Sequence, residues 1–349
     1  MRTLVLAVLF AFALSPLLSQ QKGAPTYEDA VAVYEDLFTK EKPLHLTLKF
    51  DVKALQKTKY QDVTHEAEMS FAGHDDIQVN HPVQLKSGES IRQKICYLPP
   101  LWVKITDSGI KSVSHQEGFR MHIITRCKSS TQYESYVLRE YLAYKLYNLI
   151  TPLSYRVRLV KLSIIDTGRD NEVTEDWAFI QEPDELMALR LNAMMIENDK
   201  LSMPTMNPEV MNSLSMYQYM IGNPDYSVTG RHNLNILTYK EYGPEGFIPI
   251  PYDFNYSGLV NAEYAIPGEA LGTSSVRERY YLGPCRPEEV HNETIQELST
   301  FKDEIMAYIK DFEYLDDADK ADMIGYLDSF FKESEESGFI DQKITPTCR

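Results

Sequence analysis

The hydrophobic periodicity of this chain changes at Ser130. Before that residue, short stretches alternate between apolar and polar side chains, which is typical of half-buried strands. After it, apolar residues recur every three or four positions, which is typical of amphipathic helices. The predicted strands lie at 44–50, 66–71, 77–85, 102–105 and 121–125, after a short helix at 27–38. We therefore expect a β-rich part followed by a mainly helical part.

The second part of the chain begins with a predicted helix that ends before Pro152. Thr131 followed by Glu134 is a capping-box pattern, and leucines continue the helical spacing to residue 149. A hairpin is predicted next, with strands at 155–165 and 177–180, and then helices at 184–192, 208–221 and, in two pieces, 288–332. The stretch 222–287 is irregular, and such loops on a rigid scaffold often carry chemistry.

The first twenty residues have the layout of a secretory signal peptide. Arg2 precedes an unbroken apolar run of eleven residues, 4–14, which is too short to span a bilayer. Small residues and Pro16 follow, so cleavage is expected near Ser19 or Gln20. The product would be a secreted, periplasmic or cell-envelope protein without a membrane span. The alternative is a buried N-terminal helix.

The net charge disfavours one class of partner, and the cysteines predict disulfides. The 349 residues carry a formal net charge of −16, which disfavours nucleic acid because its phosphates would be repelled. An even number of cysteines in an exported chain predicts two disulfides, with three possible connectivities. Pairing Cys96 with Cys127 and Cys285 with Cys348 is expected because each bridge then stays within one half of the chain.

Two segments of the irregular stretch, 219–237 and 247–258, each place an acidic residue beside a short apolar strand. The loop 240–246 between them has the length of a hairpin connection, and a hairpin would bring Asp225, Asn233 and Asp253 together. Two carboxylates and an amide suit Mg²⁺ better than zinc. Phosphoryl transfer uses such a set, although Asp and Asn are also ordinary turn residues.

Four motifs, taken in order, resemble the spore-coat kinase family known as CotH, a divergent branch of the protein-kinase-like fold. They are the helix LREYLAYKL at 138–146, Asn-Pro-Asp at 223–225, Asn233, and Pro-Tyr-Asp-Phe-Asn at 251–255. The resemblance implies an α+β, two-lobed protein-kinase-like fold. A β-rich N-terminal lobe would occupy 21–182 and a mainly helical C-terminal lobe, carrying the catalytic-loop and metal-binding segments, would occupy 183–349.

The same resemblance implies roles for the polar residues of the C-terminal lobe. Asp225 would be the catalytic acid/base, and Asn233 and Asp253 would bind the metal ions. Asn255 is either a third metal ligand or a turn residue. Glu182 would lie at the lobe junction, near the adenine.

In the N-terminal lobe, the resemblance implies that Glu140 pairs with a phosphate-binding lysine. The family's RG-rich loop is not matched, because this chain has Lys-Ser-Gly-Glu at 86–89. Lys104 is the candidate lysine, since a strand position would aim it at the phosphates, and Arg120 or His122 could substitute. On sequence alone, Glu140 is also compatible with a solvated helix position.

The implied function is that of an exported kinase. It would transfer phosphate from ATP, with Mg²⁺ or Mn²⁺, to a Ser or Thr hydroxyl of a surface or secreted protein. The altered glycine loop favours one alternative, a catalytically inactive kinase-like binding module. The other alternative is a structural envelope protein in which the disulfides and the acidic surface matter more than any cleft.

Overall fold

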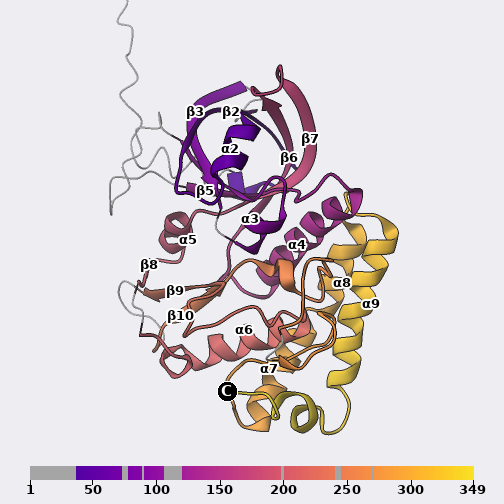
Figure 1. The fold of residues 1–349 in the computed structure, drawn as a ribbon. Helices are drawn as coiled ribbons and strands as arrows, with labels where there is room; N and C mark the ends of the chain where they lie inside the picture. Colours follow the sequence, from indigo (N-terminus) through magenta and orange to yellow (C-terminus); the bar gives the residue numbers. More distant parts are fainter. Residues whose placement is uncertain are drawn as a thin grey trace, which may run out of the picture.

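The structure is a computed structural model that describes residues 37–72, 78–88, 90–105, 120–197, 200–239, 245–268 and 271–349. Within these residues a β-rich N-terminal part stands on a mainly helical C-terminal part (Figure 1). The change of periodicity at Ser130 thus predicted the α+β class correctly. The predicted signal peptide, and most of the helix predicted at 27–38, lie outside the described residues.

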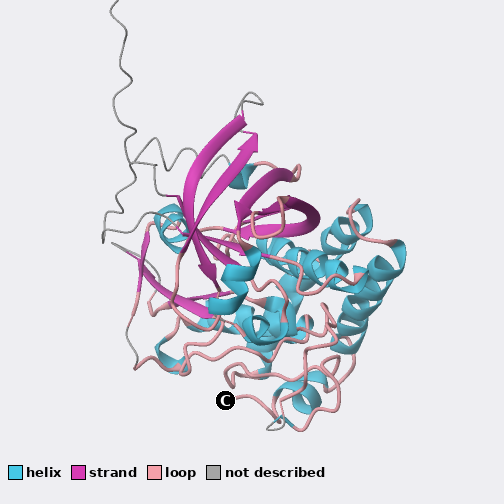
Figure 2. Cartoon of the chain, turned by 45° about the horizontal axis from the view of Figure 1, so that its top comes forward, coloured by secondary structure: helices cyan, strands magenta, loops and turns pink. Residues whose placement is uncertain are grey.

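Seven strands form one closed sheet. They are β1 (Leu44–Phe50), β2 (His65–Ala72), β3 (Gln78–Ser87), β4 (Leu101–Ile105), β5 (Arg120–Ile124), β6 (Val157–Asp166) and β7 (Glu172–Gln181). Their order is β1-β2-β3-β4-β5-β7-β6, and a parallel pairing between β1 and β6 closes the sheet. Figure 2 shows the strands in magenta and the helices in cyan, with most of the helices on one side of the closed sheet. The predicted strands are confirmed with small shifts at their ends, except that the strand predicted at 177–180 begins five residues earlier, at Glu172.

The alternation in the sequence decides which side of each strand faces the inside of the closed sheet. In β1, Leu46, Leu48 and Phe50 are buried, whereas Lys49 points outward to Glu68 of β2. Buried aliphatic side chains from the other strands complete this core. The periodicity did not predict two short helices, α2 (Val52–Thr58) and α3 (Ile91–Ile95). Val52 and Leu55 of α2 belong to the core of the closed sheet, and α3 lies below that sheet in Figure 1.

The C-terminal part is built on α4 (Thr131–Ile150), which contacts β6, β7 and α8. The elements that follow the β6–β7 hairpin are α5 (Asp184–Arg190), β8 (Ala193–Met195), α6 (Pro208–Met220), β9 (Leu234–Tyr239), β10 (Ile248–Pro251), α7 (Glu288–Thr300), α8 (Lys302–Asp311) and α9 (Asp317–Ser334). The prediction of two helical pieces at 288–332 is wrong, because the chain bends at Phe301 and again between α8 and α9 and so forms three helices.

Both predicted disulfides are confirmed. Cys96 is bonded to Cys127 and Cys285 to Cys348, across sequence separations of 31 and 63 residues. In the part of the chain that the structure describes, no helix is long and apolar enough to cross a membrane.

Candidate functional site

The hairpin predicted from the two apolar strands is present as β9 and β10, which pair antiparallel from Leu234 opposite Pro251 to Leu237 opposite Ile248. Asn233 precedes β9 and Asp253 follows β10, and the backbone N–H of Tyr252 donates to the carbonyl of Asn233 over 3.1 Å. Asn233 and Asp253 have φ angles of 51° and 57°, in the left-handed region that Asn and Asp tolerate better than most residues. Both polar residues are thus fixed at one end of the hairpin.

Asp225 is hydrogen-bonded to Asn233, in agreement with the prediction that the hairpin brings these two residues together. The side-chain amide of Asn233 donates to the Asp225 carbonyl over 2.7 Å and to Asp225 Oδ2 over 3.1 Å. His232 Nε2 lies 2.8 Å from the other carboxylate oxygen, Oδ1, and this hydrogen bond raises the pKa of His232. The Asp225 carboxylate is therefore oriented by two neighbours while 35% of its side chain stays exposed to solvent.

Asp253 is held from three directions. Its backbone N–H donates to the hydroxyl of Tyr144 over 2.7 Å, and that hydroxyl donates to Gln181 of β7 over 3.0 Å. Its carboxylate oxygen Oδ1 accepts from Arg92 over 3.0 Å and also from the side-chain amide of Asn255. Asn255 is 2% exposed, and its Oδ1 is buried without a hydrogen-bond partner.

Arg92, on α3, joins Asp253 to Glu140. Its guanidinium donates to both carboxylate oxygens of Glu140, over 2.7 and 3.2 Å, while it also contacts Asp253. The Arg92 and Glu140 side chains are only 2% and 1% exposed. A charge so deeply buried requires close partners, and the bidentate geometry supplies them. The Nε of Arg92 is buried without a hydrogen-bond partner.

The charges of this cluster are unequal, because two carboxylates share one guanidinium. Burial raises the pKa of Glu140 to about 8; Arg92 opposes the rise, and the Asp253 carboxylate adds to it. His122 of β5 lies beside the cluster, where burial and the charge of Arg92 lower its pKa to about 4. The excess negative charge of the two carboxylates is neutralised either by a proton on Glu140 or by a further cation.

The prediction that Lys104 pairs with Glu140 is wrong, since Arg92 occupies both oxygens of that carboxylate. Lys104 lies on β4, where it pairs with Gln84 of β3 and Arg120 of β5. It is on the same, outer face of the strand as Trp102. The periodicity could not reveal Arg92, because it lies on a five-residue helix rather than on a strand. One signal was available: Arg92 lies four residues before Cys96, a cysteine predicted to pair with Cys127 just ahead of the helix that carries Glu140.

Glu182 directly follows β7 and precedes α5, at the passage from the closed sheet to the helical part. Its buried carboxylate binds Arg156 over 2.7 Å and Arg190 over 2.9 Å. The Glu182 side chain therefore fixes the connection between β7 and α5 through these two ion pairs. Its predicted position near an adenine stays a prediction.

The larger cavities lie elsewhere. Neither Asp225 nor Asp253 lines any of four cavities, of about 230 to 1120 Å³, that the described residues form. The largest lies between the β6–β7 hairpin and α8 and is lined by Trp177, Tyr308 and Tyr314 among others. In the described ranges, no group of three or more His, Cys, Asp and Glu side chains is placed to hold a metal ion, so a metal site at Asp253 would need amide ligands such as Asn233 and Asn255.

Comparison with known proteins adds no family assignment: no family model matches the chain, and no curated protein matches it significantly.

Proposed function

We propose that this protein is an exported, metal-dependent phosphotransferase with a two-lobed, protein-kinase-like arrangement, which transfers phosphate from ATP to a Ser or Thr hydroxyl of a surface or secreted protein. The observation that carries the proposal is the buried bridge from Glu140 through Arg92 to Asp253, together with the bonded pair of Asp225 and Asn233 at the same end of the β9–β10 hairpin. In phosphoryl transfer a cation paired to a helix carboxylate positions the phosphates, and two Asp residues divide metal binding and proton acceptance between them.

Each side chain has a task in this proposal. Arg92 takes the place predicted for a lysine, because it pairs with Glu140, and its Nε is the donor left without a hydrogen-bond partner. Asp225 would accept the proton of the attacking hydroxyl, because it is the partly exposed carboxylate of the set. Asn233 and His232 each hold one of its oxygens and so fix its direction.

The oxygen donors around Asp253 fit Mg²⁺ or Mn²⁺. Asn255 Oδ1 is buried and unpartnered beside the Asp253 carboxylate, and the cluster carries an excess of negative charge. Asp253, Asn233 and Asn255 are the residues that would hold the metal. A divalent cation at this place would neutralise charge on the transferred phosphate.

Transfer of label from γ-labelled ATP to the protein itself or to a general acceptor protein tests the activity. Asp225→Asn should reduce the rate about a hundredfold or more, because the proton acceptor is lost while the shape of the side chain is kept. Asp170→Asn is the matched control, since Asp170 lies in the β6–β7 turn with a φ angle of 49° and is exposed. Equal rates for Asp225→Asn and wild type would refute the assigned role.

A kinase-like module that binds nucleotide without transferring phosphate is the second candidate. One observation favours it: Arg92 already occupies Oδ1 of Asp253, an oxygen that a catalytic metal ion would otherwise bind. This candidate predicts that ATP with Mg²⁺ raises the unfolding temperature through mass action while no label is transferred. Label transfer by wild type that Asp225→Asn abolishes would exclude it.

A further inference from the structure

The Cys96–Cys127 disulfide lies at the centre of a small apolar cluster, separate from the larger cores. We call it the disulfide cluster. Its buried members are Cys96, Cys127, Tyr133, Tyr136, Val260, Ala262 and Ala265, with Ile95, Tyr256, Tyr264 and Val276 packed at its margin. The two cysteines are only 2% and 3% exposed. Three parts of the chain meet here, and each supplies one residue of the bridge formed by Arg92, Glu140 and Asp253.

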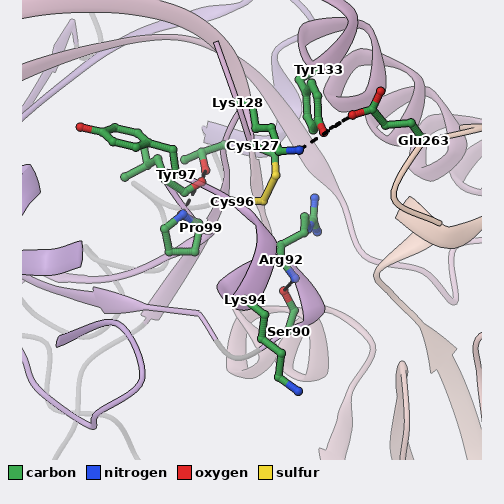
Figure 3. Close-up of a disulfide and its surroundings, with 12 residues drawn as sticks. Ser90, Arg92, Lys94, Cys96, Tyr97, Pro99, Cys127, Lys128, Tyr133 and Glu263 are labelled. Carbon is green, nitrogen blue, oxygen red and sulfur yellow. Dashed lines mark hydrogen bonds and ion pairs between the residues drawn. A yellow bond between two sulfur atoms is a disulfide. The ribbon is translucent and has the colours of Figure 1, made fainter. Parts of the chain in front are cut away.

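The first part is α3, which carries Arg92. Cys96 caps the C-terminus of this helix, and its backbone N–H donates to the carbonyl of Arg92 over 2.9 Å. Tyr97, the next residue, donates its N–H to the carbonyl of Cys127 over 2.9 Å. Figure 3 shows Arg92 on the short helix that leads to the disulfide. The bond therefore fixes the helix one turn away from Arg92.

The second part is the first two turns of α4. Tyr133 and Tyr136 pack in the disulfide cluster, and Glu140 follows Tyr136 by four residues, on the same face of the helix. Lys128, beside Cys127, lies 3.9 Å from Glu263, and Tyr133 donates to the same carboxylate (Figure 3). The helix face that touches the disulfide thus continues into the carboxylate that touches Arg92.

The third part is the segment after Asp253. Tyr256, three residues further on, packs at the margin of the disulfide cluster, and its hydroxyl donates to the carbonyl of Tyr264 over 3.3 Å. Ala262 and Ala265 are buried in the cluster. Asp253 is therefore anchored to the same cluster as the other two residues of the bridge.

We propose that the Cys96–Cys127 disulfide is a positioning element, which holds Arg92 against Glu140 and Asp253 and so assembles the anion-binding end of the candidate site. A five-residue helix has too few hydrogen bonds to keep its own conformation, so contacts from outside must set the position of α3. The cost of burying Arg92 and Glu140 is offset only while both stay in contact. The proposal deepens the proposed function, on which its consequence for nucleotide binding rests.

Other hydrogen bonds also hold α3, and they define the alternative to the proposal, in which the disulfide is not needed to position Arg92. Ser90 caps its N-terminus, Tyr60 donates to the carbonyl of Lys94 over 3.5 Å, and Lys59 donates to the carbonyl of Cys96 over 3.1 Å. Tyr60 is 63% exposed, but Lys59 is half-buried, and the side-chain amide of Gln93 on α3 donates to the carbonyl of Lys59. If these contacts were sufficient, Arg92 would keep its place without the disulfide.

The second disulfide provides a matched control. The Cys285–Cys348 disulfide holds the C-terminus, where the backbone N–H of Cys285 donates to the carbonyl of Arg349 over 3.2 Å. It does not join any of the three segments that supply Arg92, Glu140 and Asp253. The experiment compares wild type, Cys96→Ser/Cys127→Ser and Cys285→Ser/Cys348→Ser by ¹⁵N NMR of the arginine side chains. The Nε–H of Arg92, assigned through its absence in Arg92→Lys, is buried and should exchange slowly with water.

We expect slow exchange in wild type and in the Cys285/Cys348 variant, and exchange faster by about tenfold or more in the Cys96/Cys127 variant, because α3 then opens locally. Equal exchange in the two variants would overturn the proposal. Should the Cys96→Ser/Cys127→Ser variant fail to fold, Cys96→Ala/Cys127→Ala removes the bond without placing hydroxyl groups in the apolar cluster. It should also accelerate exchange, and an unchanged rate there would overturn the proposal as well.

This readout needs no nucleotide, so it separates the positioning role from the proposed function. Fast exchange in the Cys96/Cys127 variant of a protein that binds no ATP would uphold the positioning role and reject the proposed function. If ATP does bind, its Kd should rise about tenfold or more in the Cys96/Cys127 variant and stay within twofold in the Cys285/Cys348 variant.

Discussion

Arg92 brings a positive charge into the interior, where its two acidic partners come from distant parts of the chain. Glu140 is 48 residues away and Asp253 is 161 residues away. Each partner is in turn restrained: Glu140 lies on a long helix, and Asp253 is held through its backbone by Tyr144. The position of the guanidinium thus depends on the tertiary structure as a whole, whereas the local sequence around Arg92 contributes only one helical turn.

Tyr144 offers a direct test of how Asp253 is held. Tyr144→Phe removes a hydroxyl that accepts from Asp253 N–H and donates to Gln181, leaving the half-buried Asp253 and the buried Gln181 without that partner. We expect the free energy of unfolding to fall by about 1 to 3 kcal/mol, measured by urea denaturation. Tyr97→Phe, at a tyrosine 51% exposed, serves as the control. A loss no larger than that of the control would show that this hydrogen bond is unimportant.

His122 should make stability depend on pH. Burial, with the nearby Arg92, lowers its pKa from 6.5 to about 4, so the unfolded chain takes up a proton before the folded protein does. The stability present above pH 6.5 is therefore lost as the pH falls toward 4, and we expect a loss of about 2 kcal/mol from this group between pH 7 and pH 5.

The measurement is urea denaturation at pH 7 and pH 5. His122→Gln should lose less stability between the two pH values than wild type does, whereas replacing the exposed His45 by Gln should leave the wild-type difference unchanged. An identical pH dependence in His122→Gln and wild type would contradict the account of His122.

At the scale of elements, α4 connects the candidate site to the rest of the molecule. Tyr133, Tyr136, Glu140 and Tyr144 are spaced three or four residues apart and so share a face that runs from the disulfide cluster to Asp253. On another side of α4, Arg139 binds Asp319 and Asp322 of α9. Through these contacts, α4 connects the candidate site with the closed sheet and with the C-terminal helices.

Closure of the sheet by β1 can be tested at its most buried position. Leu48 is 0% exposed and lies opposite Ile164 of β6 in the parallel pairing. Leu48→Ala should destabilise the fold by about 3 kcal/mol through a lost core side chain and the cavity left behind. Lys49→Ala, on the outer face, should cost less than about 1 kcal/mol. Comparable losses in urea denaturation would mean that β1 does not face a packed core.

Much of this architecture was predictable because the periodicity of the sequence records burial. The strands of the closed sheet, α4 and the β9–β10 hairpin follow from alternating or helical spacing. The parallel pairing of β1 with β6 did not follow, because partners more than 100 residues apart leave no mark in a local pattern. Asp225, Asn233 and Asp253 were found through their hairpin, whereas Arg92 was missed because its side chain reaches the site from a single helical turn.

At the scale of the whole molecule, each disulfide restricts the unfolded chain. Loop-closure entropy predicts a contribution of about 4 kcal/mol for either bond, since separations of 31 and 63 residues differ little on a logarithmic scale. We therefore expect both double serine variants to lose stability in thermal or urea denaturation, and the Cys96/Cys127 variant to lose at least as much as the other, because its cysteines are only 2% and 3% exposed. A much smaller loss for Cys96/Cys127 than for Cys285/Cys348 would contradict this contribution to the fold.

Binding of ATP in the presence of Mg²⁺, followed by titration calorimetry, tests the central proposal most directly. Asp253→Asn is the decisive variant because Asn tolerates the left-handed backbone at φ 57° while the carboxylate charge is removed. We predict that wild type and Asp170→Asn bind one ATP per chain, and that Asp253→Asn binds at least about tenfold more weakly. No binding by wild type at millimolar ATP with Mg²⁺ or Mn²⁺, or equal binding by Asp253→Asn, would contradict the proposal.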